Sequence, residues 1–183
     1  MKHLKYLVLF ITMACLSCER DDICAESTST TPRLIVEFYD ATDTDLLKNV
    51  PRLTVYGEDL PISNPPTEET EATIRFNENT NSVALPLKIE AENIEVTTRF
   101  ILERSTNLRL DTNASTTSNV DIIEIKYIPQ FKYVSRACGY KSIFTNLIVQ
   151  EDIDGDGDRW ITSIEVVDLI VENENTVHVR ILH

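Results

Sequence analysis

Apolar and polar residues alternate along most of this 183-residue chain, from Leu34 to Ile181. Successive side chains of a β-strand point to opposite faces of a sheet, so a period of two predicts strands with one buried and one hydrated face. Two-faced strands favour antiparallel pairing, because parallel sheets are usually covered on both faces. The residues predicted to face the core are Leu34, Val36, Phe38, Leu53, Val55, Val83, Leu85, Leu87, Ile89, Ile94, Val96, Thr98, Phe100, Leu102, Ile123, Ile125, Tyr127, Val177, Val179 and Ile181.

Clusters of turn-forming residues divide this alternating pattern into short segments. Their number and length predict a single antiparallel β-sandwich of about nine or ten strands, with a β-barrel as the alternative. Pro86 cannot donate a hydrogen bond to a neighbouring strand, so its strand is expected at a sheet edge or at a bulge. A single short helical turn is expected at residues 43–48. The turn clusters lie at 63–66, 77–82, 111–119 and 152–158.

Residues 1–17 have the features of a bacterial lipoprotein signal peptide. Two lysines provide a positive start, and an apolar run follows at 6–16. At 11 residues this run is shorter than the ~20 needed for a membrane-spanning helix. Cys18 follows a small serine and would carry diacylglycerol and palmitate on the first residue of the mature protein. The alternative is an ordinary secretory signal cleaved near Cys15, without a lipid.

The lipid on Cys18 would tether a folded domain to a membrane. Residues 18–31 are polar and lack an alternating pattern, which predicts a lipidated acidic tether, and residues 32–183 are predicted to form the β-sandwich domain. The segment Arg20-Asp21-Asp22 resembles the basic-acidic-acidic tag by which many lipoproteins of the Bacteroidota reach the cell surface, although short charged segments are also common in solvated tethers. We therefore expect an outer-membrane location, facing the periplasm or the cell surface.

The net charge of −13 restricts the classes of partner. Removal of the signal peptide also removes Lys2 and Lys5, which makes the mature chain more acidic still. Nucleic-acid binding needs clustered basic residues, so we expect no nucleic-acid partner. The membrane link is accordingly expected to be the lipid anchor.

Two cysteines remain in the mature chain after Cys18, namely Cys24 and Cys138. In an oxidising compartment they are expected to form one disulfide, and the alternative is one or two free thiols. No histidine or carboxylate near Cys138 in the sequence suggests an activated, catalytic thiol.

The strongest local candidate for a ligand site is the acidic segment at 152–158. Carboxylates at alternate positions followed by Gly157 match the first half of a calcium-binding loop. The second half does not match, because Ser163 occupies the position where a bidentate glutamate is required. The alternative is a plain hairpin turn, and any calcium affinity is expected to be weak. The candidate ligands are Asp152, Asp154, Asp156 and Asp158.

Other chemistry-bearing residues are few. Trp160, the single tryptophan, is expected to fill the core, with an exposed sugar-stacking platform as the alternative. His178 and His183 are expected at the surface or rim of the domain. No nucleophile motif or phosphate-binding glycine loop occurs. The paired carboxylates of a glycoside hydrolase are brought together by the fold and not by sequence spacing, so the sequence neither predicts nor excludes them.

One further set of segments is informative, namely 18–24, 31–34, 133–140, 160–161 and 178–183. Together these segments resemble a family of uncharacterised lipoproteins of flavobacteria and their relatives, a domain of unknown function. The resemblance implies the lipid anchor and supports pairing Cys24 with Cys138. Such proteins tend to be encoded beside an outer-membrane β-barrel protein, which makes a barrel of this kind a candidate partner.

These observations favour a lipid-anchored, monomeric, non-catalytic binding or assembly module of the outer membrane. An exposed sheet edge or apolar patch would support this role. A surface carbohydrate-binding module is the first alternative and would use an exposed aromatic row, including Tyr39 and Tyr56. An enzyme with a carboxylate-based site is the second alternative and would need a deep pocket.

Overall fold

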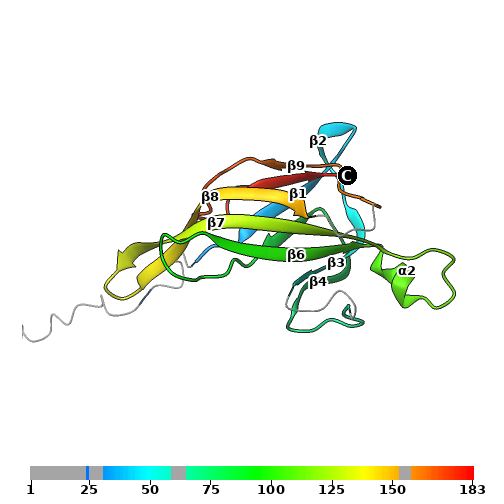
Figure 1. The fold of residues 1–183 in the computed structure, drawn as a ribbon, viewed down its shortest axis with the longest axis horizontal. Helices are drawn as coiled ribbons and strands as arrows, with labels where there is room; N and C mark the ends of the chain where they lie inside the picture. Colours follow the sequence, from blue (N-terminus) through cyan, green and yellow to red (C-terminus); the bar gives the residue numbers. More distant parts are fainter. Residues whose placement is uncertain (1–23, 25–30, 59–64, 153–157) are drawn as a thin grey trace, which may run out of the picture.

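The computed structural model describes residue 24 and residues 31–58, 65–152 and 158–183, and these form a β-sandwich (Figure 1). Ten strands in this part of the chain form two five-stranded sheets that pack face to face. The predicted all-β sandwich is confirmed, and the alternative of a closed barrel is wrong. Among the described residues, no helix is long and apolar enough to cross a membrane.

The first sheet combines the beginning and the end of the chain. Its order is β2-β1-β10-β9, and β5 pairs with the first half of β1. β1 and β10 are parallel, with Val36 opposite Val179, whereas the other pairs of this sheet are antiparallel. The strands are β1 (Leu34–Asp40), β2 (Asp43–Leu47), β5 (Ser82–Leu85), β9 (Ser163–Val166) and β10 (Val179–Leu182).

The second sheet is antiparallel throughout and contains the two longest strands. Its order is β4-β3-β6-β7-β8. A five-residue helix, α2 (Thr106–Leu110), follows β6. The strands are β3 (Val50–Gly57), β4 (Thr73–Thr80), β6 (Val96–Arg104), β7 (Asn119–Ser135) and β8 (Gly139–Asp152).

The core between the sheets contains most of the residues that the alternation predicts. Leu34, Val36 and Phe38 of β1 and Ile123 and Ile125 of β7 are fully buried there. Burial of an apolar side chain of this size stabilises the fold by about 1.5–3 kcal/mol. The alternation therefore identifies the core-facing side of these strands correctly.

The ends of two predicted rows differ from the prediction. Ile89 and Ile94 are more than half exposed, because β5 ends before Ile89 and β6 begins after Ile94. Pro86 follows the last residue of β5. Among the described strands, β5 pairs only with β1. The predicted edge position of this strand is confirmed. The segment at 43–48, expected as a helical turn, instead forms the exposed strand β2.

A second, smaller cluster lies on the other face of the second sheet, opposite to the core. Tyr56 is fully buried there beside Ile101 and Ile122, so the prediction that its ring points into solvent is wrong. Burial raises the pKa of Tyr56 to about 12. Tyr39, also expected outward, is largely covered as well, and the Arg180 guanidinium lies 4.9 Å from its ring centre.

The prediction of surface histidines is wrong, because His178 and His183 are both buried. The Ile35 N–H donates a 3.0 Å hydrogen bond to Nδ1 of His178. The His183 ring packs edge-on against Phe38 and Trp160, with ring centres 6.2 and 5.7 Å away. Burial lowers the pKa of both histidines, since the charged imidazolium loses its hydration.

The two histidines predict a loss of stability in mild acid. Below the ordinary histidine pKa of 6.5 the unfolded chain binds protons that the folded chain resists, so the free energy of unfolding falls as the pH drops from 6.5. Each additional proton bound on unfolding contributes a slope of about 1.4 kcal/mol per pH unit. Urea unfolding between pH 7.5 and 5 measures this slope.

The matched control for this experiment is the double variant His178→Gln/His183→Gln. It should show a flatter pH dependence in this window than the unmodified protein. Hydrogen bonds from Arg33 lower the pKa of Glu174 to about 2. The contribution of Glu174 to the free energy of unfolding is therefore lost only below its ordinary pKa of 4.5, outside the pH window of this experiment. An equal slope in the variant would contradict the assignment to these histidines.

Candidate functional site

The most prominent feature outside the core is a two-stranded arm formed by β7 and β8. β6 pairs with β7 only as far as Val96 opposite Tyr127. Beyond this point β7 pairs with β8 alone among the described strands, from Ile128 opposite Thr145 to Ser135 opposite Gly139. The arm (residues 128–145) consequently extends beyond the sandwich, as Figure 1 shows at the end of β7 and β8.

The base of the arm is held by contacts from two loops. The Asn93 N–H donates to the Pro129 carbonyl over 2.9 Å, and the Phe131 N–H donates to Oε1 of Glu92 over 3.1 Å. On the other strand, Lys141 Nζ donates to the main-chain oxygen of Glu172 over 3.0 Å. These contacts fix the direction of the arm relative to the sandwich.

One face of the arm is aromatic. Tyr133 and Tyr140 are directly opposite each other, and their ring centres lie 5.4 Å apart in an edge-to-face arrangement. Phe131 is two residues from Tyr133 on the same strand and therefore shares this face. The rings are 44%, 55% and 70% exposed for Phe131, Tyr133 and Tyr140, respectively. Three adjacent exposed rings form an unusual surface for an acidic domain.

The opposite face of the arm is basic. Lys132 lies opposite Lys141, and Lys132 forms an ion pair with Glu172. Arg136 is exposed in the turn at the tip. Residues 125–150 contain no aspartate or glutamate, although the chain has 30 acidic residues. The alternation does not predict this surface, and the 26-residue gap in acidic residues is the signal that could have identified it.

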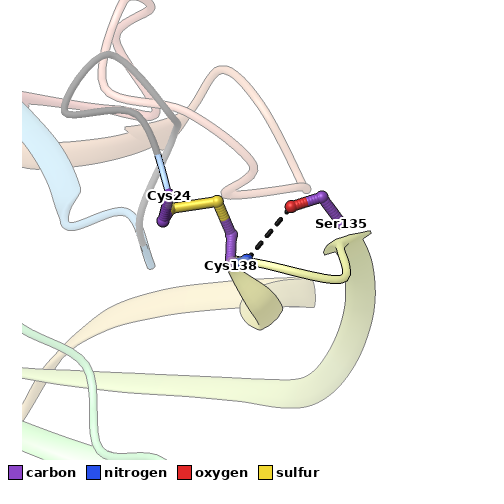
Figure 2. The surroundings of a disulfide bond; sticks show 3 residues. All are labelled: Cys24, Ser135 and Cys138. Atoms are coloured by element: carbon purple, nitrogen blue, oxygen red, sulfur yellow. Dashed lines mark hydrogen bonds between the residues drawn. A yellow bond between two sulfur atoms is a disulfide. The ribbon is translucent and has the colours of Figure 1, made fainter. Parts of the chain in front are cut away.

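The tip of the arm is bonded to the N-terminal segment. Cys24 and Cys138 form a disulfide with a Cα–Cα distance of 4.8 Å (Figure 2), so the predicted pairing is present in the structure. The Cys138 N–H donates to Oγ of Ser135 over 3.0 Å, and Gly139 adopts a positive φ of 68°. Glycine accepts this conformation without steric cost, which allows the chain to enter β8 directly after Cys138.

A second exposed apolar surface lies along the outer edge of β8. The main chain after β9 runs beside this edge, with Val171 bridged to Phe144 and the Leu147 N–H donating to the Leu169 carbonyl. The side chains exposed along this seam are about half accessible to solvent and are here called the edge surface. The edge surface consists of Ile148, Val167, Leu169 and Ile170.

Two further features of the described part of the chain are open clefts. One, of about 290 Å³, is lined by Glu58, Glu71, Lys88, Arg99 and neighbouring apolar residues. The Arg99 guanidinium donates hydrogen bonds of 2.9 and 2.6 Å to the Glu124 carboxylate. Lys126 and Arg99 together lower the pKa of Glu124, which is typical of a structural ion-pair network. The other cleft, of about 380 Å³, lies over β4 and is mostly polar.

Several predicted site residues lie outside the described part of the chain. Asp154 and Asp156 are among them, as are Cys18 and the predicted signal peptide at 1–17. Asp158 is exposed at the start of the segment leading to β9. The described residues contain no group of three potential metal ligands, but most of the acidic segment is not among them. Calcium binding by Asp152, Asp154, Asp156 and Asp158 stays a prediction.

Trp160 lies in the core, so the alternative of a sugar-stacking platform at this residue is wrong. Its main-chain N–H and that of Ile161 both donate to Oδ2 of the buried Asp121, over 3.0 and 2.7 Å. The indole N–H donates to the Leu102 carbonyl over 3.3 Å. These bonds connect the segment before β9 to the second sheet.

The fold and its surfaces define an all-β sandwich domain with a disulfide-linked, aromatic arm. Residues 52–183 match the model of a family of unknown function, DUF6452, and the chain belongs to this family. The matched part includes the arm and the edge surface. Comparisons with curated proteins and with solved structures give no match.

Proposed function

We propose that this protein is a lipid-anchored, non-catalytic binding or assembly module of the outer membrane. Cys18 carries the anchor, and the sandwich is monomeric and faces the periplasm or the cell surface. The partner is an integral β-barrel protein of the same membrane, the class that the sequence resemblance suggests. The edge surface is the observation that carries the proposal.

The edge surface is suited to a protein contact for two reasons. It places four half-exposed apolar side chains on β8 and on the chain that runs beside its edge, where burial by a partner would remove them from water. It also lies on a rigid element, because the bridge between Phe144 and Val171 holds the main chain at this seam. A partner can therefore dock without ordering a loop first, which lowers the entropic cost of binding.

The carbohydrate-binding alternative has less support. Tyr39, Tyr56 and Trp160, the rings that suggested it, are each at least nine-tenths buried. A sugar-binding face needs exposed rings on which the ligand can stack, and in the described part of the chain these lie on the arm rather than at the predicted positions. The carboxylate-based enzyme also has less support, because the Arg99 network beside the first cleft pairs its buried carboxylate with cations.

The proposal predicts that Leu169→Glu reduces partner recovery without unfolding the domain. The side chain of Leu169 is 59% exposed, so the substitution adds a charge to the edge surface at little cost to the core. The measurement is affinity purification of the tagged, membrane-anchored protein after mild crosslinking, with mass spectrometry of the recovered proteins. We expect one barrel protein in near-stoichiometric amount with the unmodified chain and much less with the variant.

Leu46→Glu is the matched control, because Leu46 is similarly exposed but belongs to β2. It should recover as much barrel protein as the unmodified chain. Recovery of the barrel protein with Leu169→Glu at the unmodified level would remove the edge surface from the contact. Failure to recover any barrel protein from the unmodified chain would contradict the assembly role itself.

A further inference from the structure

The disulfide limits how far the tip of the arm can lie from the lipid. Cys24 is six positions after Cys18, and a fully extended chain of this length spans at most about 20 Å. The Cα atom of Cys138 lies 4.8 Å from that of Cys24. Cys138 therefore stays within about 25 Å of a lipidated Cys18 in every conformation of the tether.

The aromatic face of the arm has the composition of a membrane–water interface. Tyrosine is enriched at the headgroup level of membrane proteins, because its ring is apolar and its hydroxyl remains hydrated. Tyr133, Tyr140 and Phe131 continue the alternation of the inward-facing Ile123, Ile125 and Tyr127, but extend past the region where the first sheet covers them. Tyr133 and Tyr140 pack against each other, and all three side chains remain between 44% and 70% exposed.

The charge of the arm makes it a better site for a lipid contact than the rest of the protein surface. An acidic protein is repelled by anionic lipids, and this repulsion is smallest where acidic residues are lacking. Residues 125–150 are such a stretch, and its Lys132 and Lys141 offset the nearby Glu172 on the face away from the rings. The one basic side chain in the tip turn, Arg136, is exposed.

We propose that the aromatic face of the arm lies on the bilayer surface, with Phe131, Tyr133 and Tyr140 at the headgroup level. This inference rests on the proposed function, because it requires the lipid on Cys18. The arm acts as a second membrane contact beside the anchor and sets the orientation of the sandwich. The edge surface on β8 is then presented at a fixed height above the membrane, where an integral partner can reach it.

The test uses tryptophan as a depth reporter in the full-length lipidated protein. Trp160 is the only natural tryptophan and is 6% exposed, so it contributes a constant background. Tyr140→Trp places a reporter on the arm, and Leu46→Trp places one on β2, which lies away from the arm tip (Figure 1). Both variants are reconstituted into vesicles of phosphatidylethanolamine and phosphatidylglycerol whose acyl chains are brominated near the headgroups.

We expect the fluorescence of Tyr140→Trp to shift to shorter wavelength and to be quenched by the brominated lipids, and that of Leu46→Trp to remain unchanged. Tyr133→Trp is a second arm reporter and should behave like Tyr140→Trp. Equal, weak quenching of the arm and β2 reporters would overturn the inference. So would crosslinking of a photoreactive residue at position 140 to a barrel protein in cells, because the arm would then contact protein.

Flotation of the same vesicles separates this inference from the proposed function. The unmodified chain should float with the vesicles, and Cys18→Ser, which lacks the lipid, should not. If the unmodified chain does not float, the anchor is absent and the proposed function fails. If it floats but the arm reporters are not quenched, the anchor stands and the lipid contact of the arm is overturned.

Discussion

Cys138→Ser is expected to lower the free energy of unfolding by about 4–5 kcal/mol. The disulfide closes a loop with a sequence separation of 114, and without it the unfolded chain gains the conformational freedom of that loop. For a protein of this size, such a change lowers the melting temperature by about 10–15 °C. Guanidinium unfolding of the oxidised full-length protein, with and without the substitution, measures the effect.

The controls for this experiment are the partner variant and chemical reduction. Cys24→Ser and the double variant should match Cys138→Ser, because each removes the same single bond. The unmodified protein in excess reductant should match all three. A midpoint in Cys138→Ser equal to that of the oxidised protein would contradict the stabilising role. The disulfide would then serve to position the arm tip rather than to stabilise the fold.

The strand pattern could be predicted well because it depends on local information. The alternation identified the buried sides of β1 and β7, such as Phe38 and Ile123, since one face of a strand must be apolar wherever a sheet packs on another. It could not identify what covers the opposite face. Tyr56 looked solvent-facing by its position, but α2 packs on this face of β3, where Thr106 donates a hydrogen bond to Thr54.

The arm could not be predicted from periodicity for a related reason. Alternation continues through Phe131 and Tyr133 in the same way as through the core strands. The pattern therefore does not reveal where the first sheet stops covering β7. The histidines illustrate the opposite case. His178 and His183 belong to a central strand region beside β1, and their burial follows from a parallel pairing between the two ends of the chain, which no local pattern indicates.

Arg109→Met is expected to destabilise the protein by about 3 kcal/mol, the lower end of the cost of breaking a buried ion pair. The Glu103 carboxylate is fully buried and accepts hydrogen bonds of 2.6 and 2.8 Å from the Arg109 guanidinium. The substitution leaves this carboxylate buried without its cation. We take the lower end of the range because the Arg109 side chain is 21% exposed, so water reduces the interaction. Urea unfolding measures the change.

The double variant Glu103→Leu/Arg109→Met decides which contact is responsible. Replacing both members of a buried pair by apolar side chains is often nearly neutral, so the double variant should recover most of the lost stability. Arg109 also donates a 2.8 Å hydrogen bond to the Pro66 carbonyl and thereby connects the chain before β4 to α2. If the double variant is as unstable as Arg109→Met, this contact with Pro66 stabilises the outer face of the sheet. Recovery would show instead that Arg109 mainly compensates the Glu103 charge, and that apolar packing around Tyr56 is sufficient to hold the outer layer in place.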